Sequence, residues 1–162
     1  MNKTKKLTYV TMLTALAIVI NVAENAFLPE LPLGIRFGLA NIIALIAINL
    51  FTYKEMTTVN IMRVVLANLI SGTIFGTKFF IAIGGIILSS IALIILKKLK
   101  CTIIFSSIIS ALAHMIGQIL VVSFIYGTLN MFLAFPLYIV SAIGTGILTG
   151  IIANEVLKRV RI

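Results

Sequence analysis

Aspartate and tryptophan are absent from this 162-residue sequence, and cysteine and histidine each occur once. Without aspartate, the chain cannot supply the paired aspartates that hold magnesium and a diphosphate. It also lacks the G-x-x-x-x-G-K-[ST] loop that cradles nucleotide phosphates. The lone Cys101 excludes an internal disulfide, and one histidine with no suitable carboxylate neighbour does not assemble a nucleophilic triad. We therefore predict no catalytic residue, no metal site and no cofactor.

Apolar residues dominate what is present: 61% of the chain is hydrophobic and 10% is charged. Soluble domains have roughly half apolar and a quarter charged residues, so lipid must solvate this chain. A helix needs ~20 residues to cross a ~30 Å hydrocarbon core, and six such segments use the whole length. We predict one all-α transmembrane domain over residues 1–162, an integral membrane bundle of about six helices. The predicted spans are about 7–28, 36–53, 55–75, 79–97, 102–125 and 131–157.

Basic residues cluster at the ends of these predicted spans and give the chain a formal charge of +9. With the N-terminus inside, ten lysines and arginines fall on the cytoplasmic side, and only Arg36 and Lys78 fall outside. This asymmetry follows the positive-inside rule, so we predict that both termini are cytoplasmic. The basic residues are not interleaved with aromatic residues as a nucleic-acid groove requires, so we predict no nucleic-acid partner.

The third predicted span carries a polar stripe formed by Asn60, Arg63, Ala67 and Ser71, which lie within ~60–80° of one another on a helical wheel. Arg63 falls near the bilayer midplane, where an arginine needs a counter-charge, backbone carbonyls or a ligand. No carboxylate is predicted at its depth. Capping of a neighbouring helix end and contact with a ligand therefore remain equal alternatives for Arg63.

The first and fifth predicted spans carry similar polar faces. On the first, Thr14, Asn21 and Asn25 lead up to Glu24. A lone buried histidine is usually a packing element, but small residues and Gln118 accompany His114, so a cavity is an equal alternative. The face on the fifth span consists of Ser107, Ser110, Ala111, His114, Gly117 and Gln118.

Polar residues from several spans gather in the predicted outer half of the bundle, which indicates a pocket open to the outside. Two acids and two bases (Glu24, Glu30, Arg36 and Lys78) lie above the mid-membrane residues. Their charges nearly cancel except for Arg63, so an anionic or zwitterionic ligand is our hypothesis. The predicted ligand-binding residues are Glu24, Arg36, Asn41, Arg63, Asn68, His114 and Gln118.

Small residues at four-residue spacing predict helix packing, because they let helix backbones approach closely in lipid. The last span has such a ridge at Ala142, Gly146 and Gly150, followed by Asn154. Gly85 and Ser89 form a shorter one on the fourth span.

Three segments, LGIRFGLANI at 33–42, RVVLAN at 63–68 and AHMIGQ at 113–118, carry a resemblance to a known family. Over about residues 8–158, the chain resembles the bacterial family called heptaprenyl diphosphate synthase component I, also named Gx transporter. Asparagine is common in that family where Met115 stands here. The resemblance also implies kinship with the S components of energy-coupling factor transporters, six-helix proteins of the bacterial cell membrane that capture vitamins or other small molecules from outside.

S components dock on a separate coupling subunit and paired ATPases, so the resemblance implies such partners for this chain. In S components, alanines four residues apart on the first helix often serve docking. Thr11 and Ala15 have this spacing here, but the strict alanine pair is missing.

Two functions of different classes follow. The first is uptake of a small molecule bound by the outer polar residues and energised by separate subunits. The second is a non-catalytic membrane partner of a soluble prenyl diphosphate synthase in quinone side-chain synthesis, limited to a supporting role by the missing aspartates. The second would depend on the basic residues 97–100 and 158–161, and a purely structural membrane protein would depend on neither set.

Overall fold

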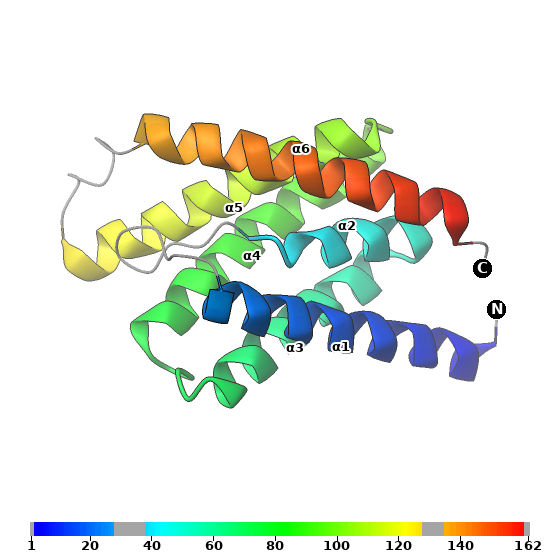
Figure 1. The fold of residues 1–162 in the computed structure, drawn as a ribbon, viewed down its shortest axis with the longest axis horizontal. Helices are drawn as coiled ribbons and strands as arrows, with labels where there is room; N and C mark the ends of the chain where they lie inside the picture. The colour runs from blue at the N-terminus through cyan, green and yellow to red at the C-terminus, as the bar shows by residue number, and fades with distance from the viewer. Residues whose placement is uncertain (1, 28–37, 128–134, 161–162) are drawn as a thin grey trace.

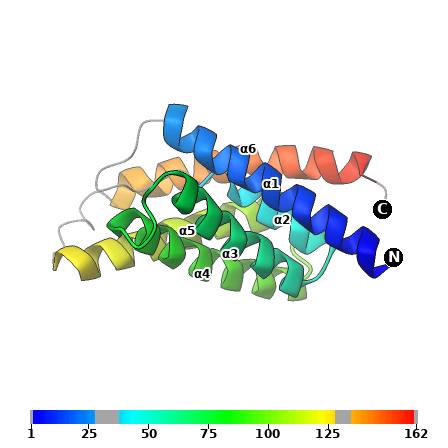
Figure 2. The same cartoon turned by 90° about the horizontal axis from the view of Figure 1, so that it is seen from below.

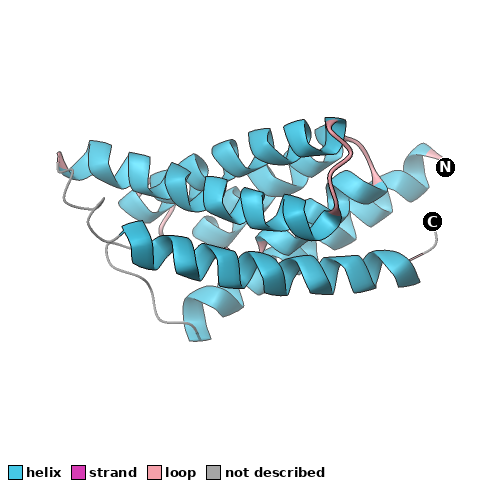
Figure 3. Cartoon of the chain, turned by 90° about the horizontal axis from the view of Figure 1, so that it is seen from above, coloured by secondary structure: helices cyan, strands magenta, loops and turns pink. Residues whose placement is uncertain are grey.

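The computed structural model describes residues 2–27, 38–127 and 135–160, and in these ranges it contains helices and no strand (Figure 3). The predicted all-α bundle of six helices is therefore confirmed. The helices are α1 (Lys3–Phe27), α2 (Asn41–Leu50), α3 (Tyr53–Ile70), α4 (Thr77–Lys98), α5 (Ile103–Tyr126) and α6 (Phe135–Arg159).

Four of these helices, α1, α4, α5 and α6, are long and apolar enough to cross a membrane. The chain is accordingly a helical membrane protein. α3 has 18 residues but includes the charged residues Lys54, Glu55 and Arg63. α2 has only 10 residues, so it rises ~15 Å, about half of the hydrocarbon thickness.

The second and third predicted spans extend well beyond the helices observed. The second, predicted over 36–53, is helical only from Asn41 to Leu50, and residues 36–37 lie outside the described ranges. Gly38 has a left-handed φ of +76°, and Thr52 already caps α3 in a capping box with Glu55. The third span, predicted to reach residue 75, ends at Ile70, because Gly72 and Phe75 both adopt left-handed φ values. Apolar windows do not detect such backbone reversals.

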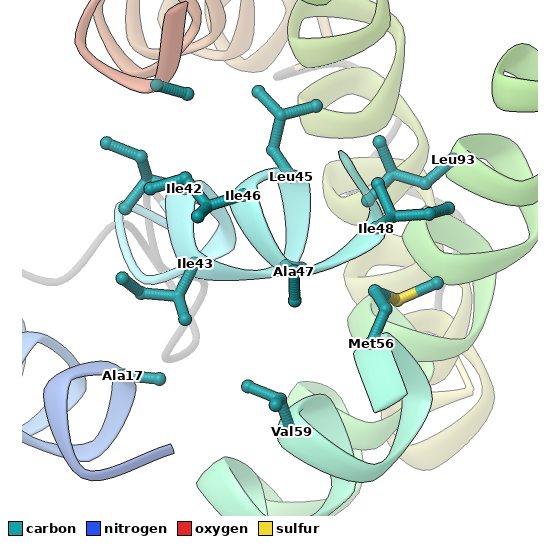
Figure 4. Packing of buried hydrophobic residues seen from close by; sticks show 12 residues of the cluster. Ala17, Ile42, Ile43, Leu45, Ile46, Ala47, Ile48, Met56, Val59 and Leu93 are labelled. Carbon is teal, nitrogen blue, oxygen red and sulfur yellow. The ribbon is translucent and has the colours of Figure 1, made fainter. Parts of the chain in front are cut away.

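The short helix α2 forms the centre of the bundle and contacts each of the other five helices. Its sequence, NIIALIAINL, is apolar on all sides, as expected of a fully enclosed helix. Every residue of α2 from Asn41 to Ile48 is buried. Figure 4 shows its isoleucine, leucine and alanine side chains packed around Ala17 of α1, Met56 and Val59 of α3, and Leu93 of α4.

Both chain termini lie at the same end of the bundle (Figures 1 and 2). Lys6 of α1 bridges Glu55 of α3 there, and Lys97 of α4 donates to Asn49 of α2. We call this the basic end. Its described lysines and arginines are Lys3, Lys5, Lys6, Lys54, Lys97, Lys98, Lys100, Lys158 and Arg159.

Glycines bring α5 into backbone contact with its neighbours. A Cβ on Gly84 of α4 would lie 2.7 Å from the carbonyl oxygen of Gly117 on α5. A Cβ on Gly146 of α6 would lie 2.7 Å from the Cα of Ile108, and one on Gly150 would lie 3.0 Å from the Cα of Ile104. The packing predicted for the Gly146 and Gly150 ridge is therefore present.

Candidate functional site

Polar side chains from three helices line one enclosed cavity in the bundle. We call Asn21, Glu24, Arg63, His114 and Gln118 the central polar cluster. Each is at most 8% exposed, so these groups are withdrawn from solvent. The cavity has a volume of about 10 Å³, room for about one water molecule. Its remaining lining residues are Gly38, Val64, Ala82 and Ile86.

Arg63 and Glu24 line this cavity together, with 2% and 7% of their surfaces exposed. The prediction that no carboxylate would lie at the depth of Arg63 is therefore wrong. The two residues lie on separate helices, α1 and α3, and tertiary packing sets where the polar faces of those helices meet, which apolar windows do not predict. Opposite charges in one cavity reduce the cost of burying either one.

Glu24 also ties α1 to the segment before α2. The backbone N–H of Gly38 donates to Glu24 Oε1 at 2.7 Å. Gly38 has a φ of +76°, and a Cβ there would lie 3.1 Å from Cδ2 of His114. Both the backbone conformation and the space beside the imidazole thus favour glycine at this position.

The imidazole of His114 is held between polar partners and glycines. Its Nε2 lies 3.2 Å from Gln118 Nε2, and its Nδ1 lies 3.5 Å from Ser89 Oγ. A Cβ on Gly85 would lie only 2.6 Å from Cε1 of the ring. His114 and Gln118 are four residues apart on α5, so the predicted shared face of the fifth span brings them into contact.

Asn41, the first residue of α2, lies beside the cluster. Its Nδ2 donates to Ser110 Oγ at 2.8 Å, and Ser110 is one helical turn before His114. Within the described part of the chain, the buried Oδ1 of Asn41 accepts no hydrogen bond. The first three amides of α2 already donate to the carbonyls of residues 38–40. At the start of α2, the Oδ1 of Asn41 is therefore the atom that can still accept a hydrogen bond.

The structure gathers some predicted site residues and separates others. Glu24, Arg63, His114 and Gln118 line the cavity, and Asn41 adjoins it. Asn68 does not line it: Asn68 Nδ2 donates to the Val64 carbonyl, and Asn68 Oδ1 accepts from Thr73 Oγ1, both at 2.8 Å.

The remaining predicted residues lie elsewhere. Arg36 and Glu30 fall outside the described residues. Asn21 was expected only as part of a polar stripe, yet it lines the cavity, and its position three residues before Glu24 on α1 was the signal for this. Among the described residues, no three histidine, cysteine or acidic side chains converge to hold a metal ion.

Comparison with known proteins identifies the family. No curated protein and no solved structure is similar enough to match the chain. The family model described as heptaprenyl diphosphate synthase component I matches residues 13–156, most of the 162-residue sequence. The chain therefore belongs to the heptaprenyl diphosphate synthase component I family.

Proposed function

We propose that this protein captures a small molecule in the central polar cluster and takes part in its uptake across the bacterial cell membrane. The observation that carries the proposal is the joint burial of Arg63, Glu24, His114 and Gln118 inside a bundle solvated by lipid. Ionisable groups at such depth are costly and typically mark a ligand or ion pathway. We place the basic end and both termini in the cytoplasm, following the positive-inside rule.

The ligand that suits this cluster is anionic or zwitterionic. Arg63 offers planar donors that match a carboxylate or a phosphate. The start of α2 adds the positive end of a helix dipole, and half-length helices commonly point this end at anionic substrate groups in transporters. Asn41 Oδ1 and the Glu24 carboxylate supply acceptors for an N–H or ammonium group of the same ligand.

Entry of a ligand larger than water requires the helices around the cavity to separate. α1 is the least enclosed of the four long helices, and it packs chiefly against α3 and α2 (Figure 2). Movement of α1 would open the cluster while leaving His114 and Gln118 in place on α5. We expect α1 to act as the gate.

Energy for uptake would come from other subunits, by the resemblance to S components. The partners we propose are a coupling subunit and ATPases. Thr11 and Ala15 of α1 are both exposed, as a docking surface requires.

The test is native mass spectrometry of the protein gently solubilised from its own host. We expect a bound small molecule and co-purifying ATPase subunits. Arg63→Glu should lower occupancy by the bound molecule at least tenfold, because the reversed charge repels an anionic group. Arg159→Glu is the matched control, because Arg159 is exposed at the basic end and its reversal should leave occupancy unchanged.

A check of folding and a second variant complete this test. Circular dichroism and thermal unfolding establish that the variants are folded, and Arg63→Gln removes the charge without adding a second carboxylate to the cavity. Unchanged ligand occupancy in folded Arg63→Glu and Arg63→Gln would overturn the proposal.

The second candidate is a non-catalytic membrane subunit of a heptaprenyl diphosphate synthase, favoured by the family description. Its soluble partner would supply the aspartates that this chain lacks. Recovery of a prenyl diphosphate synthase without transport subunits would favour this role. Loss of that recovery on replacing Lys97, Lys98 and Lys100 with glutamine would assign docking to the basic end.

A further inference from the structure

A second recess, separate from the central polar cluster, opens at the basic end between the first turns of α1 and α3. Its volume is about 270 Å³. Val10, its deepest residue on α1, precedes Asn21 by 11 residues, ~16 Å along the helix, so the two sites share no residue. We call it the lysine groove, and it is lined by Lys3, Lys6, Leu7, Val10, Lys54, Glu55 and Thr58.

The lysine groove carries excess positive charge. Lys6 Nζ lies 2.5 Å from Glu55 Oε1, and Glu55 is further fixed by the capping box with Thr52. Among the described residues, no carboxylate pairs with Lys3 or Lys54. Two lysine charges on opposite walls of the groove therefore remain to attract an anion.

The groove is also amphiphilic along the bundle axis. Leu7 and Val10 lie one and two helical turns after Lys3 on α1, and Leu7 is 67% exposed. Lysines at the end of a membrane helix lie at the level of the lipid head groups, with apolar neighbours toward the acyl chains. An occupant with a compact anionic head and an apolar tail matches both levels at once, whereas a water-soluble anion would leave the apolar wall unused.

We propose that the lysine groove binds a membrane lipid whose head group is a phosphate monoester or a diphosphate. A phosphate monoester or diphosphate head brings about two or more negative charges to Lys3 and Lys54, whereas a phosphodiester lipid brings only one. The volume is slightly below the ~300–1,000 Å³ of pockets that enclose a drug-sized molecule, so it suits a head group with the tail left in the bilayer beside Leu7. This inference does not depend on uptake through the central polar cluster.

The test uses the full chain in nanodiscs of phosphatidylcholine that contain equal small fractions of phosphatidic acid and phosphatidylglycerol. Native mass spectrometry then measures which lipid the released protein retains. We expect preferential retention of phosphatidic acid. Lys3→Gln with Lys54→Gln should reduce that retention by about tenfold, because each interfacial lysine contributes substantially to anionic lipid attraction. This double variant leaves the Lys6–Glu55 bridge intact.

The matched control is Lys5→Gln with Lys98→Gln, which removes the same charge from the same end but from residues outside the groove. It should leave the retention of phosphatidic acid unchanged. Three results would overturn the proposal: equal retention of both anionic lipids, unchanged retention of phosphatidic acid in the Lys3→Gln and Lys54→Gln double variant, or an equal loss in the control variant. Ligand occupancy in the Arg63 variants is a separate readout, so this inference and the uptake proposal fail independently.

Discussion

The two sides of the bundle are held together by different means. In the most apolar stretch of α4, 44% of the residues are buried, against 22% in that of α1. α4 and α5 meet backbone to backbone at Gly84 and Gly117, which leaves no space for a side chain. Three threonines of α1 bond within their own helix, since Thr8, Thr11 and Thr14 each donate to the carbonyl four residues earlier. Close backbone packing therefore holds the α4–α5 side, whereas side-chain contacts with α3 and α2 hold the less buried α1.

The central polar cluster lies at the seam between these two sides. His114 and Gln118 belong to the closely packed side, whereas Asn21 and Glu24 belong to α1. One side can thus keep its half of the site in position while the other moves. From this comparison we infer that α4 and α5 hold the site in position, whereas movement of α1 would open it to a ligand.

The largest expected effect comes from adding one methyl group to the closely packed side. Gly117→Ala should destabilise the fold by ~2 kcal/mol, because the new Cβ would overlap the Gly84 carbonyl and neither backbone can give way. Thermal unfolding in detergent measures the change. Gly144→Ala on α6 is the control: its Cβ meets no atom within 4 Å, so it should be neutral or stabilise by up to ~1 kcal/mol. Equal melting of the two variants would contradict the comparison.

A smaller loss of stability is expected at Gly85, because this glycine faces a side chain, whereas Gly117 faces a backbone. A Cβ on Gly85 would lie 2.6 Å from the His114 ring, and a side chain can shift more readily than a helix backbone. Gly85→Ala should therefore cost ~1 kcal/mol, less than Gly117→Ala, while displacing the imidazole from the cavity. Loss of the bound small molecule with near-normal melting would separate site geometry from stability. If the variant keeps both the bound small molecule and near-normal melting, the imidazole is not a ligand contact.

Part of this architecture could be predicted from residue spacing alone. The 3.6-residue period placed His114 and Gln118 on one face, and clustering of basic residues placed both termini at one end of the bundle. Small residues at 142, 146 and 150 predicted a close approach by α6, which Gly146 and Gly150 make.

Other features required the folded chain. Glu24 and Arg63 line one cavity because α1 and α3 pack with their polar faces toward it, which spacing within either helix does not predict. The central position of α2 depends on five neighbours that hydrophobicity alone does not arrange. The lysine groove is lined by Lys3 and Lys54 from separate helices, and no local pattern predicts that they share one recess.

The smallest effect concerns the ion pair that helps to hold α1. The hydrogen bond from Lys6, followed by that from Thr52, lowers the pKa of Glu55 from 4.5 to about 2, at the polar start of α3. Because the folded-state pKa is depressed, the contact stabilises the protein above about pH 4.5, and this stabilisation is lost as the pH falls toward 2. Lys6 is 37% exposed, so we expect less than ~1 kcal/mol.

Glu55→Gln should therefore lower the melting temperature slightly at neutral pH, and its difference from the unmodified protein should shrink as the pH falls from about 4.5 to about 2. Hydrogen exchange should locate the added opening in α1, which loses its bridge to α3. Glu155→Gln is the control, because its pairs with Lys158 and Arg159 lie within α6 and join no two helices. A pH-independent difference for Glu55→Gln would mean that apolar packing of Val10 and Leu13, and not the ion pair, holds this end of α1.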